Sequence, residues 1–288
     1  MNSVSPSRTL LVLGRGSNLP TVWSNCLAGW WLSGAGNVWK LPFLLLGISL
    51  MYTGGMFLND AFDVDFDRQR RPERPIPSGK ITVAEVWRYG FGLLGAGLLF
   101  LIPCGWVAFI AAIFLVIFII VYDFTHKFLT ASPWLMGGCR FWVYLIAGAT
   151  GAIGLNSYPI VGGVALASYI VGLSYIARRE TVKGPINLWP LLFLAMPIFL
   201  ALVINTGPYR FPAILISIAL GLWIVRCVRT ILLGGEVNAP HIVSNLLAGI
   251  VLVDWLACAP ILPFAISTPI FLALFALTQW FQKFIPAT

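Results

Sequence analysis

Charged side chains are scarce in this chain: 18 basic and 10 acidic residues stand among 288, while 59% of the residues are hydrophobic. A typical soluble domain has roughly 25% charged residues. The scarcity excludes a soluble globular protein and leaves no long polar stretch for a separate soluble domain. We therefore predict one integral membrane domain over residues 1–288.

Close cysteine pairs are also missing. The five cysteines are scattered singly through apolar stretches, which argues against a zinc site and against a disulfide framework. No small-residue cleavage site follows the first apolar stretch, so we expect no removed signal peptide. The net charge of +8 does not indicate a nucleic-acid partner, because most Lys and Arg residues lie between apolar runs, where they orient membrane proteins.

Apolar runs suited to membrane helices follow one another along the chain. A spanning helix needs about 20 apolar residues, and the runs are bounded by charges, Pro or Gly. The last two runs, separated only around Pro260 and Pro263, are also compatible with one hairpin that dips into the membrane. The ten predicted helices cover residues 19–36, 41–62, 83–103, 106–122, 131–154, 159–177, 187–206, 211–232, 242–260 and 264–281.

Basic residues gather on one side of these helices. The segments before the first helix and after the second, fourth, sixth and eighth hold nearly all of them, whereas the opposite side has Lys40 and Arg210. By the positive-inside rule, the basic segments are cytoplasmic. We predict a cytoplasmic N-terminus in the inner (plasma) membrane of a bacterium, with membrane lipid as the surrounding partner.

Four of the six aspartates fall within eight residues at the end of the second predicted helix. If the helix continues, Asn59, Asp63, Asp67 and Asp60 lie at roughly 0, 40, 80 and 100° around its axis, whereas Asp65 lies at about 240°. Carboxylates on one face repel each other unless a cation lies against them. Mg²⁺ suits such a stripe, since it takes oxygen ligands from one or two carboxylates and a substrate phosphate. Carboxylates alone would also serve Ca²⁺ or a proton path.

A basic, proline-rich loop over residues 68–80 follows the aspartates. It contains Arg68 and Arg74, and guanidinium groups bind phosphate through paired hydrogen bonds. The acidic helix end and the basic loop together therefore predict a site for a Mg²⁺-diphosphate. The alternative is that the loop only anchors the protein at the membrane and its arginines neutralise the aspartates.

These residues resemble a known family. Asn59-Asp60-x-x-Asp63-x-x-x-Asp67 followed by Arg74-Pro75-Ile76-Pro77-Ser78-Gly79 is similar to the first aspartate-rich motif and the RP-x-PSG loop of the UbiA superfamily of intramembrane prenyltransferases. The resemblance implies an all-α polytopic membrane fold, a bundle of nine transmembrane helices around a central cavity, against the ten runs read from the sequence. It also implies Asn59, Asp60, Asp63 and Asp67 as ligands of Mg²⁺ that bridges to a prenyl diphosphate.

The segment after the fourth helix resembles a second family pattern, Tyr-Pro-x-x-Lys-Arg. Tyr122, His126 and Lys127 fall in its register, which implies that they approach the diphosphate. An ordinary cytoplasmic loop with a solvated His and Lys is the alternative. On the resemblance, Asp63, Asp67 and Lys127 are the candidate catalytic residues.

The second aspartate-rich motif of the family is missing. Where it should end the sixth helix, the chain has no aspartate but carries Arg178, Arg179, Glu180 and Lys183. Arg178 and Arg179 would bind diphosphate in place of a second metal, because guanidinium stays protonated and binds phosphate oxygens. The alternative is that they only anchor the loop. The altered motif is similar to that of a divergent UbiA-like branch, EboC.

Two charges lie inside apolar runs, Arg140 in the fifth and Asp254 in the ninth. Charges at that depth face a cavity or pair with one another, or else the helix ends are wrongly drawn.

The predicted function is Mg²⁺-dependent transfer of a prenyl group from a prenyl diphosphate to an unidentified aromatic or lipid-like acceptor. The alternative is a non-catalytic membrane protein that binds or moves a prenylated or phosphorylated lipid or metabolite.

Overall fold

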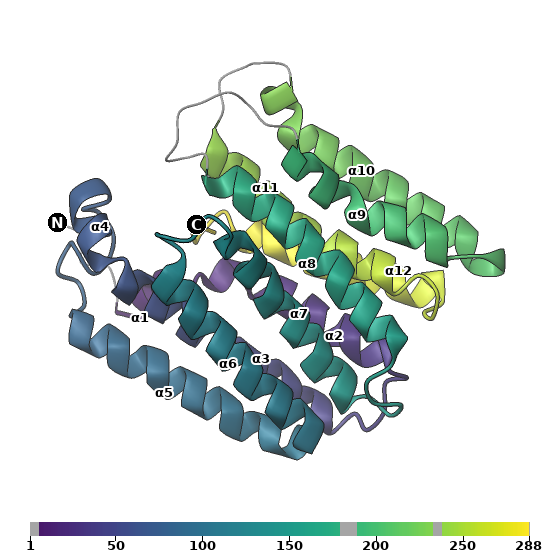
Figure 1. Ribbon diagram of the computed structural model, residues 1–288, viewed down its shortest axis with the longest axis horizontal. Helices are drawn as coiled ribbons and strands as arrows, with labels where there is room; N and C mark the ends of the chain where they lie inside the picture. The colour runs from purple at the N-terminus through teal and green to yellow at the C-terminus, as the bar shows by residue number, and fades with distance from the viewer. Residues whose placement is uncertain (1–5, 179–188, 233–237, 288) are drawn as a thin grey trace.

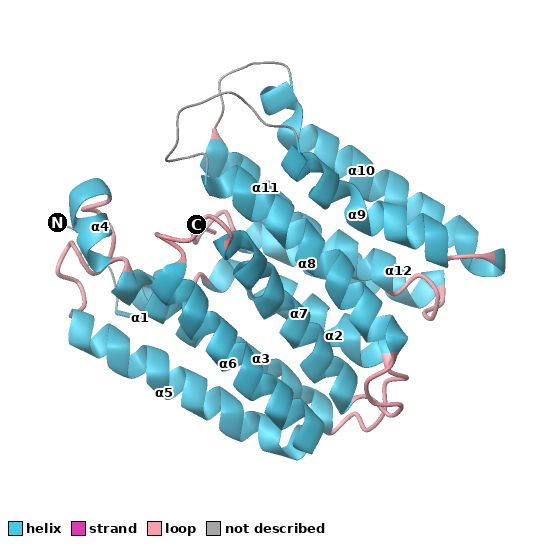
Figure 2. Cartoon of the chain, in the orientation of Figure 1, coloured by secondary structure: helices cyan, strands magenta, loops and turns pink. Residues whose placement is uncertain are grey.

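The computed structural model describes residues 6–178, 189–232 and 238–287, and over these ranges its regular secondary structure is entirely helical (Figures 1 and 2). This confirms the predicted all-α class. In chain order the helices are α1 Pro6–Leu13, η1 Gly16–Asn18, α2 Leu19–Leu32, α3 Lys40–Phe62, α4 Val64–Arg70, α5 Val83–Leu101, η2 Ile102–Cys104, α6 Trp106–Thr125, α7 Ser132–Thr150, α8 Ser157–Ala177, α9 Trp189–Ile204, η4 Gly207–Tyr209, α10 Arg210–Leu232, α11 Ala239–Ala257 and α12 Phe264–Phe281.

Each of the ten predicted runs coincides with one long helix of the described chain, from α2 to α12. The largest differences are the ends of α2 and α7, which stop at Leu32 and Thr150 rather than near residues 36 and 154. Gly34, Ala35 and Gly36 adopt φ values of 76°, 56° and 124°, which a right-handed helix does not allow. The last two runs form two separate helices, α11 and α12, each long and apolar enough to cross a membrane.

Seven helical segments of the described residues are long and apolar enough to span a membrane: Lys40–Phe62, Val83–Cys104, Trp106–Thr125, Ser157–Ala177, Gly207–Ile231, Ala239–Ala257 and Phe264–Phe281. Helix α9 is apolar but shorter, and neither α2, which has 14 residues, nor α7, which contains Arg140, is among the seven. Large apolar side chains such as Leu99, Leu192 and Phe211 are exposed, as expected for a surface in lipid. The membrane class is confirmed, whereas the count of nine or ten spans is not.

Helices α3 and α5 lie side by side through glycine contacts (Figure 1). A Cβ atom on Gly54 would lie 2.8 Å from the Gly90 carbonyl oxygen, and one on Gly97 would lie 2.8 Å from the Gly47 carbonyl oxygen. Small residues let membrane helices approach this closely. The close contact holds the end of α3, which carries the aspartates, against the rest of the bundle.

Helix α7 packs against α2, α6 and α8, near the middle of the bundle in Figure 1. The two larger buried apolar clusters are formed mainly by α2, α3, α5, α6 and α7 and mainly by α8 to α12, and a smaller third cluster includes Leu13, Phe57 and Val86. Trp31 packs against both larger clusters. The C-terminal residues return to the start of α2, where the side-chain amide of Asn18 donates to the Ala287 carbonyl oxygen (2.9 Å).

Candidate active site

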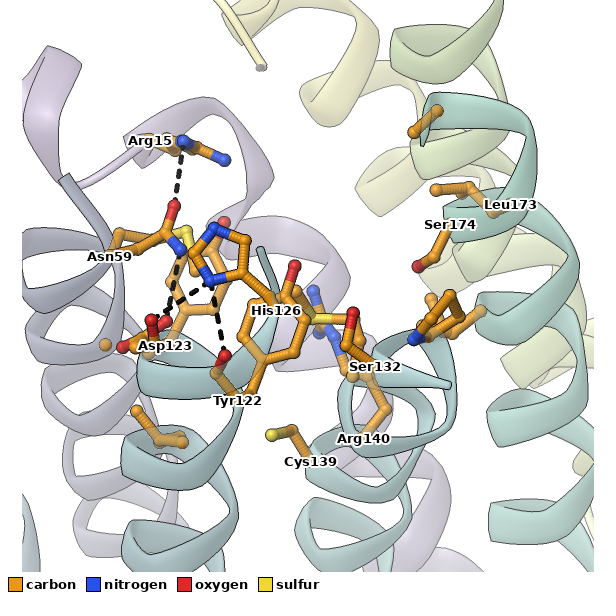
Figure 3. A pocket seen from close by; sticks show the side chains of 18 of the residues that line it. Arg15, Asn59, Tyr122, Asp123, His126, Ser132, Cys139, Arg140, Leu173 and Ser174 are labelled. Carbon is orange, nitrogen blue, oxygen red and sulfur yellow. Dashed lines mark hydrogen bonds between the residues drawn. The ribbon is translucent and has the colours of Figure 1, made fainter. Parts of the chain in front are cut away.

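A cavity of about 620 Å³ lies among α2, α3, α6, α7, α8 and α11 (Figure 3). Its polar wall contains side chains from the end of α3, the loop before α5 and the segment that follows α6. Its apolar wall contains Val22, Ile48, Leu115, Ile119, Val143, Ile170 and Leu173. The size is that of a small-molecule site, and the two kinds of wall suit a ligand with a charged head and an apolar chain.

The aspartate stripe forms although the helix breaks. Helix α3 ends at Phe62 and α4 begins at Val64, with Asp63 as the junction. The Asp63 amide still donates to the Asn59 carbonyl (3.0 Å), and the Asp67 amide to the Asp63 carbonyl (2.9 Å). Because these bonds keep the four-residue helical spacing, the break does not scatter the stripe.

Arg74 joins two members of the stripe. Its Nη1 lies 3.3 Å from Asp60 Oδ1 and 2.9 Å from Asp67 Oδ2. Arg15 adds a second cation, with Nη2 3.4 Å from Asp60 Oδ1 and 3.5 Å from Asn59 Oδ1. The sequence reasoning did not place Arg15 here, and its Arg-Gly-Ser-Asn turn before α2 was the available signal.

Asp63 is held by the segment after α6. Lys127 Nζ lies 2.8 Å from Asp63 Oδ1, and His126 Nε2 lies 3.1 Å from the same atom. Burial alone would raise the pKa of Asp63, but the hydrogen bonds from His126 and Lys127 outweigh it and hold the pKa below the usual value. Burial acts to lower the pKa of His126, yet the bond to Asp63 leaves it raised. Tyr122 stacks on the His126 ring at 5.2 Å. The structure therefore brings all three predicted residues of this segment to the aspartates.

Asp123 is a site residue that the sequence reasoning missed. Its side chain is buried, and its Oδ1 accepts a hydrogen bond from Asn59 Nδ2 at 3.1 Å (Figure 3). Its Oδ2 is buried without a hydrogen-bond partner in the described residues. A carboxylate in the last turn of an otherwise apolar helix was the signal that could have found it.

The side chains of the aspartate stripe have the chemistry that binding of Mg²⁺ requires. Asn59, Asp60, Asp63 and Asp67 offer the oxygen ligands that this ion prefers, and Asp67 Oδ1 is buried with no hydrogen-bond partner in the described residues. Burial raises the pKa of Asp67 against the opposing effect of Arg74. Among the described residues no three acidic, His or Cys side chains are grouped so that they could hold a metal ion, and Arg74 and Lys127 pair with Asp67 and Asp63.

Arg68 and Asp65 lie outside the cavity. They pair with each other at 3.2 Å, and their side chains are 60% and 83% exposed. Asp65 is thus on the outer face, as the helix geometry predicted. On a continuous helix Arg68 lies at about 180° from Asn59, on the opposite face. The structure accordingly does not bring Arg68, a predicted diphosphate ligand, to the cavity. Arg71 of the same loop does line the cavity.

Arg178 lines the cavity from the end of α8, but its guanidinium binds the segment after α6. It donates to the carbonyl oxygens of His126 (2.6 Å), Leu129 (2.7 Å) and Thr130 (2.8 Å), and to Ser132 Oγ (2.7 Å). Arg178 therefore positions the segment that carries His126 and Lys127. Arg179, Glu180 and Lys183 lie outside the described residues.

Arg140 and Asp254 are connected through Asn25. Arg140 Nη1 donates to Asn25 Oδ1 (2.6 Å), and Asn25 Nδ2 donates to Asp254 Oδ2 (2.6 Å). Ser24 and Tyr144 also donate to the Asp254 carboxylate. Arg140 lines the cavity, whereas Asp254 is fully buried behind it. Arg140 faces a cavity as predicted, whereas Asp254 neither lines the cavity nor contacts Arg140 directly, since the Asn25 amide lies between them.

The fold and cavity define a polytopic membrane protein with an amphiphilic binding site. Residues 18–230 match the UbiA prenyltransferase family, and the chain belongs to this family. It is 32% identical over 154 residues to digeranylgeranylglyceryl phosphate synthase of Sulfolobus acidocaldarius, covering 51% of this chain and 52% of the relative. It is also 32% identical over 120 residues to 4-hydroxybenzoate octaprenyltransferase of Legionella pneumophila, covering 41% and 42%. The chain thus spans about half the length of these curated relatives or less.

Two solved structures share the fold. A UbiA homologue from Aeropyrum pernix K1 without ligand superposes with a TM-score of 0.65 at 14% identity, over 87% of this chain and 96% of that one. A UbiA homologue from Archaeoglobus fulgidus bound to GPP and Mg²⁺ gives a TM-score of 0.55 at 14% identity, over 96% and 99%. At these identities the likeness establishes the fold.

Proposed function

We propose that this protein is an intramembrane prenyltransferase that moves a prenyl group from a prenyl diphosphate to an acceptor, with Mg²⁺ at the aspartate stripe. The observation that carries the proposal is the single cavity in which Asn59, Asp63, Arg74 and Lys127 line a polar end and aliphatic side chains line the rest. A diphosphate needs cations, and an isoprenoid chain needs an apolar wall. Both are present in one cavity.

The residues divide into two roles. Asn59, Asp60, Asp63 and Asp67 would hold the metal, which when bound neutralises diphosphate oxygens. Arg74, Tyr122, His126 and Lys127 would bind the diphosphate directly, because they already gather around the same carboxylates. Arg178 supports this group by holding the segment 126–132, and Arg179 remains a predicted diphosphate ligand.

The reaction breaks the bond between the allylic carbon and the diphosphate oxygen. The departing diphosphate keeps the electron pair, and the carbon then accepts an electron pair from the acceptor, which loses a proton. Fixed cations around the leaving group stabilise its charge, and the apolar wall excludes water from the carbocation. Asp63, Asp67 and Lys127 would act at the leaving group.

The acceptor is proposed to be aromatic or lipid-like. Support comes from relatives named as a digeranylgeranylglyceryl phosphate synthase and a 4-hydroxybenzoate octaprenyltransferase. The absent second aspartate motif favours the EboC-like branch and keeps the non-catalytic binding protein as the competing function. Location in a bacterial inner membrane stays a prediction.

Diphosphate release tests the function. The purified protein with Mg²⁺, a panel of prenyl diphosphates and aromatic or lipid acceptors should release diphosphate and form a prenylated product. Asp65→Ala serves as the matched control for Asp63→Ala. Tight binding of prenyl diphosphate without any release would instead support the non-catalytic alternative.

The proposed orientation has its own test. Single cysteines at positions 70 and 210 on a cysteine-free background should react from opposite sides of the membrane, with position 210 accessible from outside intact cells. Labelling of position 70 from outside would reverse the topology.

A further inference from the structure

A second cavity, of about 310 Å³, lies among α8, α9 and α11, which contact one another (Figure 1). It shares no lining residue with the larger cavity, although α8 and α11 line both cavities with opposite halves of their length. The larger cavity reaches Arg178 at the end of α8, whereas the second cavity begins at Ser157, the first residue of this helix. The second cavity therefore lies toward the end of the bundle away from the aspartates.

The helix packing itself leaves this space open. Helices α8 and α9 approach closely near Gly172, where an added Cβ atom would lie 2.6 Å from the Pro190 carbonyl oxygen. Further along α9, Pro197 and Ala201 line the cavity, and Ala165 lines it from α8. Pro197 lies inside α9 and has no N–H for the carbonyl oxygen four residues before it, and such a residue bends a helix. A bend and small side chains thus account for a cavity at one end of a close helix pair.

Asn205 brings one amide to this cavity, directly after α9. The residue is 5% exposed, and its Nδ2 donates to the Ala201 carbonyl oxygen at 2.8 Å. Its Oδ1 is buried with no hydrogen-bond partner in the described residues. Rotation of the amide by half a turn would bring Oδ1 against the Ala201 carbonyl oxygen, so Nδ2 stays toward the helix and Oδ1 is left for a ligand. Because a buried acceptor without a partner is costly, a ligand that donates a hydrogen bond here is favoured.

The polar groups lie at one end of the cavity. Ser157 and Tyr158 begin α8 and Asn205 follows α9, and the two helices run in opposite directions, so all three residues belong to the same end. From there the lining continues over about eight residues of each helix, to Ala165 and Pro197, a length of about 12 Å. Among the described residues that line this cavity, none is charged. The cavity therefore suits an uncharged molecule with a polar head and an apolar body.

We propose that this cavity binds an alcohol with an apolar chain, whose hydroxyl group donates a hydrogen bond to Asn205 Oδ1. A molecule of liquid water takes up about 30 Å³, so the cavity has room for about ten groups of that size. This is the size of a medium-chain alcohol or of the first part of a longer lipid alcohol. A single water molecule would serve Asn205 but leave the apolar part of the cavity empty. The site goes beyond the proposed prenyl transfer and does not depend on it.

Photolabelling of the purified protein in nanodiscs tests the proposal. The probe is a decyl alcohol that carries a diazirine on its chain, and mass spectrometry of the digested protein locates the label. Peptides that contain Ala165 or Ala201 should carry it. At equal concentration in the membrane, 1-decanol should compete at least about tenfold better than 1-methoxynonane, because this isomer has the same composition but cannot donate a hydrogen bond.

Variants locate the effect. Asn205→Leu keeps a side chain of similar size without the acceptor oxygen, so 1-decanol should lose its advantage over the ether. Ala165→Leu fills the cavity and should reduce labelling of these peptides to the background. Val164→Leu is the matched control, because the neighbouring Val164 is 46% exposed and does not line the cavity. It should label as the parent does.

Three results would overturn the proposal. They are equal competition by the two isomers, a label that appears only outside the cavity, and a full preference for 1-decanol in Asn205→Leu. The first two need no variant and do not depend on how a variant folds. Failure of the prenyltransferase function is a separate outcome, since the labelling requires neither Mg²⁺ nor a prenyl diphosphate. The variants should also bind prenyl diphosphate as the parent does, because the two cavities share no lining residue.

Discussion

The end of α3 and the end of α8 lie on opposite walls of one cavity, and they use different chemistry (Figure 3). The α3 end presents oxygen ligands, each held by a basic partner. The α8 end presents Ser174 and Arg178, and Arg178 is bound to carbonyl oxygens of the segment after α6. Where the family resemblance predicted a second acidic motif, this chain has Arg178, which holds the segment that carries His126 and Lys127 beside the first motif. The two ends therefore cooperate through one loop.

The largest expected effect falls on the acidic end. Asp63→Ala and Asp67→Ala should each lower Mg²⁺-dependent prenyl diphosphate binding by at least about 100-fold, because each removes a proposed metal ligand and leaves the cations paired with it without a counter-charge. Titration with and without a chelator measures the loss. Asp65→Ala, on the exposed face, should bind as the parent does, and equal losses for all three variants would refute the stripe.

The next effect tests what Arg178 does. Arg178→Ala should weaken diphosphate binding by about 10- to 100-fold, because the released segment misplaces His126 and Lys127. Arg178→Lys keeps the charge but lacks the fork that reaches several carbonyl groups, so it should resemble the alanine variant.

Distance measurements between spin labels at positions 130 and 174 would show the segment moving in both Arg178 variants. Full binding by Arg178→Lys would contradict the positioning role and favour a simple charge in place of the second metal. Normal binding by Arg178→Ala would remove Arg178 from the diphosphate site.

A smaller effect is expected at Asp123, which supports Asn59 from α6. Asp123→Asn keeps the shape and an acceptor oxygen but loses the charge, so Mg²⁺ affinity should fall by about tenfold. Prenyl diphosphate titrations at several Mg²⁺ concentrations separate metal affinity from ligand affinity. An unchanged Mg²⁺ dependence would show that Asp123 only holds Asn59.

The smallest effect concerns how α3 is held. Gly90→Ala places a Cβ atom 2.5 Å from Leu58 Cδ2 and should cost about 1 to 3 kcal/mol of stability. Gly92 on the same helix has open space around it, so Gly92→Ala is the matched control and should be neutral or slightly stabilising. Thermal unfolding in detergent compares the two.

Local patterns predicted most of the fold and the first motif. Long apolar runs predicted the helices, and the spacing of Asn59, Asp63 and Asp67 predicted a shared face that the short-range bonds preserve. The partners of that face were harder to predict, because Arg15 and Asp123 are 44 and 64 residues from Asn59 and meet it only in the folded bundle. The contacts of Arg178 belong to the same class, since no local rule links α8 to the carbonyl oxygens after α6.

The sequence predicted the helix boundaries and the number of spans less well, for a different reason. Helix α2 is short and polar where Ser24 and Asn25 serve Asp254, and α7 carries Arg140, so neither has the hydropathy of a lipid-facing span. Their neighbours shield them from lipid. Hydropathy therefore leaves α2 and α7 out of the candidate spans, although it includes the buried helix α11.

The contact of Ala287 with Asn18 has a practical consequence for anyone handling the protein. Ala287 is buried and forms part of the cavity lining beside Arg15 and Asn18. Position 287 therefore lies at the wall of the binding cavity rather than in free solvent. A fluorescent probe on a cysteine introduced there is expected to change its emission when a ligand fills the cavity.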